Sequence, residues 1–236
     1  MDQFFYSTQI YDDFIILPKD ESLHALTVIR KNIGDKLLVV DGKGSLYETC
    51  IESDNIQSCR LNIVSVDKEF GHRNYYIHIA IAPTKSHDRV EWFVEKAVEI
   101  GVQEISFILA DHSERKHIKL DRIEKRAVSS MKQSLQAFLP IINDIVPLKD
   151  VMKICSNDEK FIGYLNEGNN NHLIKSATPN KDYCMLIGPE GDFSSSEINE
   201  SQEFGFKSVS LGDNRLRTET AGLAACHILN LLNEKQ

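Results

Sequence analysis

Two glycine-containing loops, each placed directly after a short apolar strand, constrain this chain more than any other feature. The first loop follows YCMLI and reads GPEGDF (188–193), and the second follows KSVSL and contains Gly212. A helical pattern follows each loop. Glycine permits backbone conformations that other residues resist and lets a ligand approach the main chain. Two loops of matching construction predict a ligand pocket built largely from backbone, whereas one alone would be read as an ordinary strand-to-helix turn.

Neither loop has the sequence of a phosphate-binding turn. The chain contains no GxxxxGK[ST] segment, and GPEGDF lacks the GxGxxG spacing of a dinucleotide turn. The carboxylates of Glu190 and Asp192 also suit a phosphate poorly. The predicted ligand is therefore neutral or cationic.

The first third of the chain reads as short strands separated by turn residues. Strands are expected over 36–42, 45–53 and 59–66, with a hairpin turn at Asp41-Gly42-Lys43-Gly44 and a short helix over 22–30. This pattern is typical of a small β-barrel or sandwich. The segment 71–74 reads as a linker.

From residue 75 onward, strands alternate with helices. Asp88 is expected to cap a helix that ends at Gly101, and Ser194 with Glu197 forms a capping box for a later helix. Such alternation predicts a mostly parallel sheet with helices on both faces. The expected strands are 75–82, 104–109, 161–165, 183–187 and 207–211, and the expected helices are about 89–100, 120–137, 195–204 and 218–232.

Composition limits the class of protein. No run of residues approaches the roughly 18 apolar positions of a membrane helix, and the N-terminus lacks the features of a signal peptide. The five cysteines and eight histidines show no metal-ligand spacing, so we expect no metal and a reduced, cytoplasmic protein. The net charge of −8 is unusual for an RNA-binding protein, but the segment 115–132 contains seven basic residues and only two acidic ones. That stretch is either an RNA-binding face or a solvated helix.

The two loops with their flanks carry a family resemblance. IGPEGDFSSSEI (187–198) and LGDNRLRTETA (211–221) resemble the C-terminal signature of the small-subunit ribosomal RNA uracil-N3 methyltransferases, a branch of the SPOUT superfamily. The segments 24–44, 88–102 and 112–127 resemble the family's N-terminal RNA-binding domain and the first half of its catalytic domain. The resemblance covers nearly the whole chain.

This resemblance implies a fold in two parts. A PUA-like RNA-binding β-barrel is expected over 1–72, and an α/β SPOUT methyltransferase domain with a deep trefoil knot over 73–236. The loops after strands 161–165, 183–187 and 207–211 should meet and form the methyl-donor pocket. A homodimer is also implied, and the apolar last helix offers more apolar surface than one core face needs.

The implied reaction is methyl transfer from S-adenosylmethionine to N3 of a uridine in 16S ribosomal RNA, in the decoding region of the small ribosomal subunit. An acidic, backbone-rich pocket suits the sulfonium cation of this donor. Uracil N3 carries a proton and is a poor nucleophile until that proton is lost. A general base, or a cation that stabilises the uridine anion, should therefore assist.

The resemblance also implies which residues form the site. The cofactor-binding residues are Leu165, Ile187, Gly188, Pro189, Glu190, Gly191, Ser210, Leu211, Gly212, Leu216 and Thr218. The candidate RNA contacts are Arg30, Lys31, Arg89, Arg115 and Lys116.

Arg217 and Glu219 are the candidate catalytic residues. Arg217 could stabilise negative charge on the uracil oxygens, and Glu219 could accept the proton or orient Arg217. The simpler alternatives are a salt bridge between the two and, for Glu219, a first-turn residue favoured by the helix dipole.

Two segments depart from the family pattern. Asp192 stands where the family usually has a second glycine. KQSLQAFLP (132–140) replaces a Glu-Gln-Ser-Gly-Arg run, of which Gln133 and Ser134 match. These departures leave open two alternatives: a SPOUT methyltransferase with another acceptor, such as a ribose 2′-hydroxyl or a tRNA base, and an RNA-binding protein with impaired catalysis.

Overall fold

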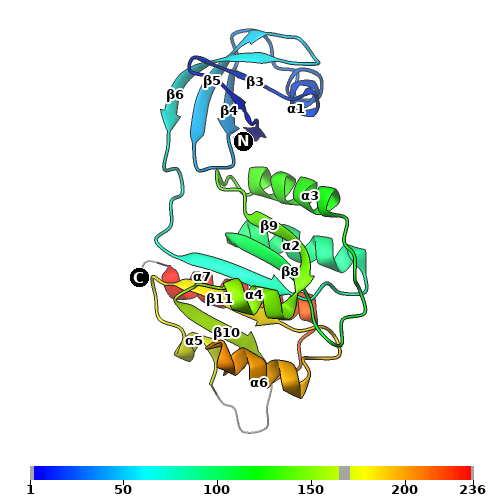
Figure 1. The fold of residues 1–236 in the computed structure, drawn as a ribbon. Helices are drawn as coiled ribbons and strands as arrows, with labels where there is room; N and C mark the ends of the chain where they lie inside the picture. The colour runs from blue at the N-terminus through cyan, green and yellow to red at the C-terminus, as the bar shows by residue number, and fades with distance from the viewer. Residues whose placement is uncertain (1–2, 165–170, 235–236) are drawn as a thin grey trace. The chain divides into compact units, whose positions relative to one another are not determined.

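The computed structural model describes residues 3–164 and 171–234, which form two compact units. The first unit comprises the chain up to His72 together with Val128–Leu139, and the second comprises Arg73–Ala127 and the chain from Pro140 onward. Figure 1 shows the elements of both units along the chain. We describe each unit by itself.

The first unit is built on a curled six-stranded sheet, in agreement with the expected PUA-like fold. The neighbouring strands are β1 (Phe4–Tyr6), β4 (Lys36–Val40), β5 (Leu46–Ser53), β6 (Arg60–Asp67), β3 (Phe14–Ile16) and β2 (Gln9–Ile10). Only β1 and β4 pair in parallel. Inward-facing side chains such as Ile15, Val39 and Leu61 are fully buried and form its core.

The helical segment of the first unit begins earlier than the sequence predicted. A short helix, α1 (Lys19–Leu23), follows Pro18 and runs into a π-helical turn, η1 (His24–Val28). Proline is favoured at a helix start, and this signal was missed. The turn ends at Arg30, whose φ of 61° is left-handed, and the Lys31 N–H donates to the Ala25 carbonyl over 3.0 Å.

Residues 137–139 of the first unit pack on the predicted hairpin turn between β4 and β5. The Gly44 N–H donates to the Ala137 carbonyl over 3.0 Å, and the Leu139 N–H donates to the Gly42 carbonyl over 2.9 Å. The preceding helix, α3 (Leu120–Gln133), ends four residues before the expected end. It stops there because Leu135 takes a left-handed φ of 55°.

The second unit contains a six-stranded, entirely parallel sheet, which confirms the α/β prediction. Its order is β12 (Lys207–Val209), β10 (Glu159–Gly163), β11 (Asp182–Ile187), β7 (Tyr76–Ile81), β8 (Glu104–Leu109) and β9 (Ile141–Pro147). The strand β9 was not predicted, and neither were α4 (Leu148–Ile154) and α5 (Leu173–Ser176).

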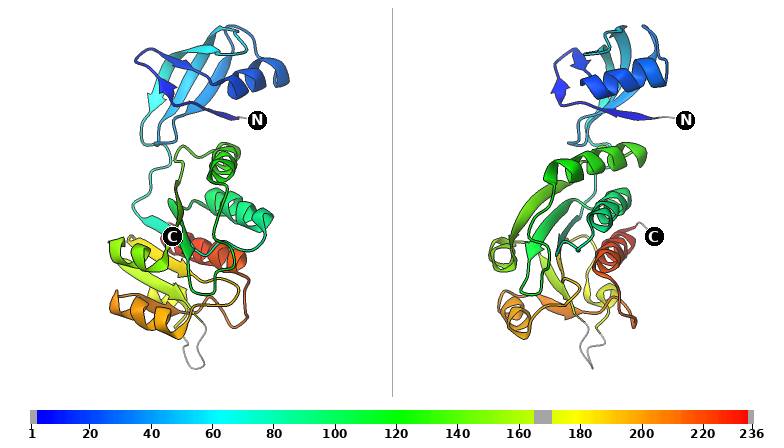
Figure 2. Two further views of the ribbon diagram at one scale, coloured as in Figure 1. Left: turned by 45° about the vertical axis from the view of Figure 1, so that its right-hand side comes forward. Right: turned by 90° about the vertical axis from the view of Figure 1, so that its right-hand side faces the viewer.

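Helices cover both faces of this sheet. The helices α2 (His87–Ile100) and α7 (Thr218–Asn233) lie on one face, and α4 and α6 (Ser195–Glu203) lie on the other (Figure 2). The apolar face of α2, formed by Val90, Phe93, Val94, Ala97 and Val98, is buried. The expected cap is wrong, because Ser86 occupies the N-cap and Asp88 is the second helical residue. The capping box of Ser194 and Glu197 is confirmed.

Three neighbouring strands end at one level of the sheet. Gly163 of β10 pairs with Ile187 of β11 and with Val209 of β12. The carboxyl ends of parallel strands are where α/β proteins bind ligands. The loops after β11 and β12 are the two glycine loops of the sequence. The knot implied for this part of the chain stays a prediction.

Candidate functional site

A cavity of about 480 Å³ lies at the carboxyl ends of β10, β11 and β12. Nine of the predicted cofactor residues line it: Ile187, Gly188, Pro189, Glu190, Ser210, Leu211, Gly212, Leu216 and Thr218. Gly191 is not among the lining residues, and Leu165 lies outside the described residues. Arg89, Gly163, Tyr164, Asp192, Val209, Asn214, Arg215, Arg217 and Ala221 complete the lining.

The lining combines apolar walls with a few charges, which is the usual composition of a small-molecule site. Ile187, Val209 and Leu211 offer surface for a flat ring. Glu190 and Asp192 supply carboxylates. Arg89, Arg215 and Arg217 supply cations, so a ligand with an aromatic part and charged groups of both signs fits this cavity.

The loop 188–193 is held by contacts with the start of α7. The Thr218 hydroxyl donates to the Gly188 carbonyl over 3.0 Å, and Nη2 of Arg215 donates to the Glu190 carbonyl over 3.2 Å. The loop itself turns through a hydrogen bond from the Asp192 N–H to the Pro189 carbonyl at 2.9 Å. The two sequence-predicted glycine loops are thus joined in space.

The glycines of the first loop were expected to adopt backbone conformations that other residues resist, and this expectation is wrong. Asp192 takes the left-handed conformation there, with φ of 64°, whereas Gly188 and Gly191 do not. These two glycines are needed for space. A Cβ at Gly188 would lie 3.1 Å from the Phe193 ring, and one at Gly191 would lie 3.0 Å from Cβ of His112. Of the three glycines in the two loops, only Gly212, with φ of 134°, uses glycine's conformational freedom.

Arg115 holds the loop between β7 and α2. Its Nε donates to the Thr84 carbonyl over 2.8 Å, and its Nη2 donates to the Lys85 carbonyl. The Lys85 N–H in turn donates to Oε1 of Glu190 over 3.2 Å, which connects this loop to the cavity wall. The ammonium of Lys85 is hydrogen-bonded to Glu114, and this bond raises the pKa of Lys85. The guanidinium of Arg115 thus contacts two backbone carbonyls, and its Nη1 lies 2.7 Å from Nε2 of His87.

A second loop, 110–117, is fastened to the loop 188–193. Nδ1 of His112 lies 3.1 Å from the Gly191 carbonyl oxygen and 2.9 Å from that of Asp192. Oδ2 of Asp111 accepts a hydrogen bond from the Ser194 hydroxyl at 2.6 Å. Sequence reasoning missed His112, because nothing in the order of residues shows that these two loops meet.

The two candidate catalytic residues occupy different places. Arg217 lines the cavity, and its guanidinium has no hydrogen bond or ion pair within the described residues. Glu219 is buried and lies 3.5 Å from Nε of Arg89. Its Oε2 has no hydrogen-bond partner among the described residues. Within the described residues, Arg217 and Glu219 do not form the salt bridge that the simpler alternative predicts. Arg89 pairs with Glu219 instead.

The candidate RNA contacts fall in both units. Arg30 and Lys31 follow the π-helical turn of the first unit, and Arg30 is exposed. In the second unit, Arg89 lines the cavity, and Lys116 is exposed in the loop 110–117. These residues stay candidates.

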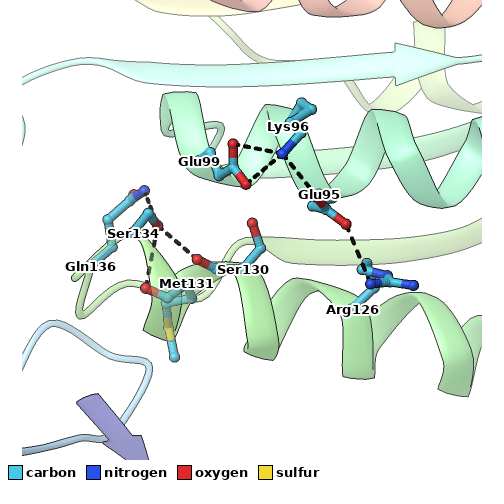
Figure 3. A network of polar contacts seen from close by, with 8 residues as sticks. All are labelled: Glu95, Lys96, Glu99, Arg126, Ser130, Met131, Ser134 and Gln136. Atoms are coloured by element: carbon cyan, nitrogen blue, oxygen red, sulfur yellow. Dashed lines mark hydrogen bonds and ion pairs between the residues drawn. The ribbon is translucent and has the colours of Figure 1, made fainter. Parts of the chain in front are cut away.

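The basic stretch of α3 is partly neutralised by acidic residues of α2. Nη1 of Arg126 lies 3.3 Å from Glu95, and Nε of Arg122 lies 2.6 Å from Glu91. Figure 3 shows the contact of Arg126 with Glu95, and Lys96 between Glu95 and Glu99. Arg122 and Arg126 therefore stabilise the packing of two helices, and the RNA-binding face stays a prediction.

Within residues 3–164 and 171–234, no three His, Cys, Asp or Glu side chains gather in a way that would hold a metal ion. In the same residues, no helix combines the length and apolar character needed to cross a membrane.

Known proteins share this architecture and sequence. Residues 72–230 match the RNA methyltransferase domain family, and residues 17–64 match the RNA methyltransferase PUA domain family. The crystal structure described as that of a "probable rRNA-methyltransferase" from Porphyromonas gingivalis is 41% identical, with a TM-score of 0.91 and 98% of both chains covered.

Proteins named ribosomal RNA small subunit methyltransferase E are also similar to this chain. The Mesomycoplasma hyopneumoniae protein is 34% identical over 61% of this chain and 64% of its own length. The Rickettsia conorii protein is 26% identical over 92% and 90%. The Neisseria gonorrhoeae enzyme, crystallised with S-adenosyl methionine, shares the fold with a TM-score of 0.86, 23% identity and coverage of 99% and 98%. This chain belongs to the RNA methyltransferase family that these proteins represent.

Proposed function

We propose that this protein transfers a methyl group from S-adenosylmethionine to N3 of a uridine in 16S ribosomal RNA, in the decoding region of the small subunit. The observation that carries this proposal is the cavity, because nine of the residues expected to bind the methyl donor line it. The relatives named ribosomal RNA small subunit methyltransferase E support the class of substrate.

The chemistry of the cavity fits the donor. The apolar walls formed by Leu211 and Leu216 suit the adenine, and main-chain groups of the loop that contains Gly212 can hydrogen-bond its edge. The carboxylates of Glu190 and Asp192 favour a cation. When bound, S-adenosylmethionine supplies an electrophilic methyl group. The protein's own task is to hold the uracil and to stabilise the charge that develops on it.

Arg217 is the residue we assign to that charge. Its guanidinium lines the cavity and has no competing partner within the described residues. A cation placed where negative charge develops on a uracil oxygen lowers the barrier, because it is already oriented before the reaction. Arg89 offers a second cation in the same cavity, held by Glu219.

The departures from the family do not disturb this site. Asp192 keeps the left-handed backbone that a glycine would supply, and its Oδ1 accepts a hydrogen bond from the Phe193 N–H at 2.8 Å. The altered segment 132–140 contributes no lining residue. We therefore infer an active enzyme rather than one with impaired catalysis.

The same proposal assigns a function to each part of the chain and includes a dimer. Residues 1–72 form the RNA-binding domain and 73–236 the methyltransferase domain, with Arg30, Lys31, Arg89, Arg115 and Lys116 as the RNA contacts. Two copies form a dimer through α7, whose residue Leu231 is 51% exposed. A ribosomal substrate places the enzyme in the cytoplasm.

Mass spectrometry of ribosomal RNA tests the proposal directly. RNA from cells that lack the protein should lose one N3-methyluridine, and the purified protein should restore it. Loss of a 2′-O-methyl group or of a tRNA modification would instead identify another acceptor. No change in any RNA would refute the activity.

Calorimetry with the donor tests the cavity. Leu216→Arg places a cation and a larger side chain in the apolar wall, and we expect the affinity to fall by at least about tenfold. Ile154→Arg is the matched control, because Ile154 is 78% exposed on α4 and lies outside the cavity lining. Equal affinities of the two variants would argue against this cavity.

A further inference from the structure

His112 lies on the loop 110–117, which is fastened to the loop 188–193 that walls the proposed donor cavity. Its Nδ1 is within hydrogen-bond distance of two carbonyl oxygens, those of Gly191 and Asp192, and Asp192 lines the cavity. The His112 side chain is exposed. The ring is therefore fixed to the cavity wall and open to a large substrate at the same time.

These two contacts determine which ring nitrogen carries the proton. Carbonyl oxygens only accept hydrogen bonds, so Nδ1 must donate and must be protonated. In the neutral ring, Nε2 is then the basic nitrogen. Within the described residues, Nε2 has no hydrogen-bond partner. The loop thus presents an imidazole with its basic nitrogen free.

The position of the ring is held by further contacts of its own loop. The Asp111 N–H donates to Oε1 of Glu197 over 2.8 Å, and the Ala110 N–H donates to the Ser113 hydroxyl over 3.0 Å. Together with the bond from Ser194 to Asp111, these contacts fix the residues on both sides of His112. A general base needs such fixed placement.

Other candidate bases near the cavity are already engaged. Glu219 is buried and is paired with Arg89. Glu190 accepts the Lys85 N–H, and Asp192 accepts the Phe193 N–H. The charged residues on the two loops that hold the ring, and at the start of α6, are Asp111, Glu114, Arg115, Lys116, Glu190, Asp192 and Glu197.

We propose that Nε2 of His112 accepts the N3 proton of the uridine. This inference rests on the proposed function, which requires a base for an acidic N–H. The electron pair of the N3–H bond becomes the new N3–carbon bond. The pair of the broken carbon–sulfur bond remains on sulfur, which becomes neutral. The proton passes from N3 to Nε2 and then to water.

The tautomer can be tested without any reaction. A long-range proton–nitrogen NMR spectrum of the free protein, above the titration of its histidines, should show His112 with its proton on Nδ1. The His112→Gln variant assigns the signal. A ring protonated on Nε2 would overturn the proposal, because that nitrogen could not accept a proton.

The dependence of turnover on pH tests whether His112 acts as the general base. His112→Gln should lower turnover near neutral pH by about 10²–10⁴-fold. The turnover of this variant should recover with rising pH, because N3 of the uridine then ionises unaided. His117→Gln is the matched control, an exposed histidine of the same loop, and should keep the wild-type profile. Donor affinity measured by calorimetry should be the same in all three proteins.

The outcomes distinguish an error in the role of His112 from an error in the proposed function. An active wild type together with a His112→Gln variant of unchanged rate and profile would overturn the role of His112 alone. A wild type that binds no donor and methylates no ribosomal RNA would overturn the proposed function, and the role of His112 with it. Loss of activity in His112→Gln without recovery at high pH would show that the ring only supports the loop 188–193.

Discussion

The Glu219 carboxylate lies 3.5 Å from Nε of Arg89, so a buried acid of α7 holds an arginine that lines the donor cavity. The Glu219 side chain is 8% exposed and that of Arg89 is 44% exposed. We therefore expect Glu219 to act on the cavity through Arg89, as a positioning residue.

A double-mutant cycle tests this relationship. Arg89→Ala and Glu219→Gln should each lower kcat/KM by about tenfold, the effect of losing one hydrogen bond to a charged group. The double variant should lose no more than either single variant, because both changes remove the same oriented cation. Additive losses would show that Glu219 acts independently of Arg89.

Arg217→Ala should lower turnover by about 10²–10³-fold and leave donor affinity within about tenfold. The reason is that a cation beside the uracil acts mainly in the transition state. Single-turnover methylation and calorimetry measure the two quantities. A collapse of donor affinity with little change in turnover would instead make Arg217 a cofactor-binding residue.

Leu135→Gly should stabilise the first unit. A left-handed backbone costs a non-glycine residue about 1–2 kcal/mol, and a glycine costs about 0.5–1 kcal/mol in the unfolded chain. Leu135 has φ of 55° and is 43% exposed, so little burial is lost. We expect a gain of up to about 1 kcal/mol in the free energy of unfolding. Leu135→Ala keeps the Cβ and should bring no such gain in hydrogen exchange or thermal unfolding.

The second unit should become less stable in mild acid because of His78. Its imidazole is buried, which lowers its pKa, and Glu104 at 3.7 Å opposes the shift. Below the ordinary value of about 6.5, the unfolded state therefore takes up this proton first. The free energy of unfolding should fall as the pH drops from about 6.5 toward the lowered folded value, by up to about 1.4 kcal/mol per pH unit.

Urea unfolding followed by the fluorescence of Trp92, the only tryptophan, measures this effect in the second unit. The His78→Gln variant removes the titrating ring and should flatten the pH dependence in that window. An unchanged slope in the variant would assign the acid sensitivity to other groups.

The sequence predicted those parts of the fold that carry a local signal. The apolar face of α2, its stop at Gly101 and the capping box at Ser194 each depend on residues a few positions apart. The strand β9 lacks such a signal, because its alternation is weak and its pairing with β8 is set by tertiary packing. The loop pocket was predicted because the same strand-loop construction occurs twice.

Long-range contacts account for what the sequence did not show in the site. The pair of Arg89 and Glu219 spans 130 positions, and His112 meets carbonyls about 80 positions away. The two departures from the family pattern show the same limit. Asp192 and Leu135 stand where the resemblance implies a glycine, and both keep a left-handed backbone that the order of residues does not reveal.

The residues that line the cavity are synthesised in a fixed order. Apart from Arg89, every lining residue lies between Gly163 and Ala221. Proteins are synthesised from the N-terminus, and earlier segments are released first. A nascent chain interrupted before α7 would lack Thr218 and its bond to Gly188. An enzyme of ribosomal RNA thus acquires its complete methyl-donor site only after the start of α7 has been synthesised.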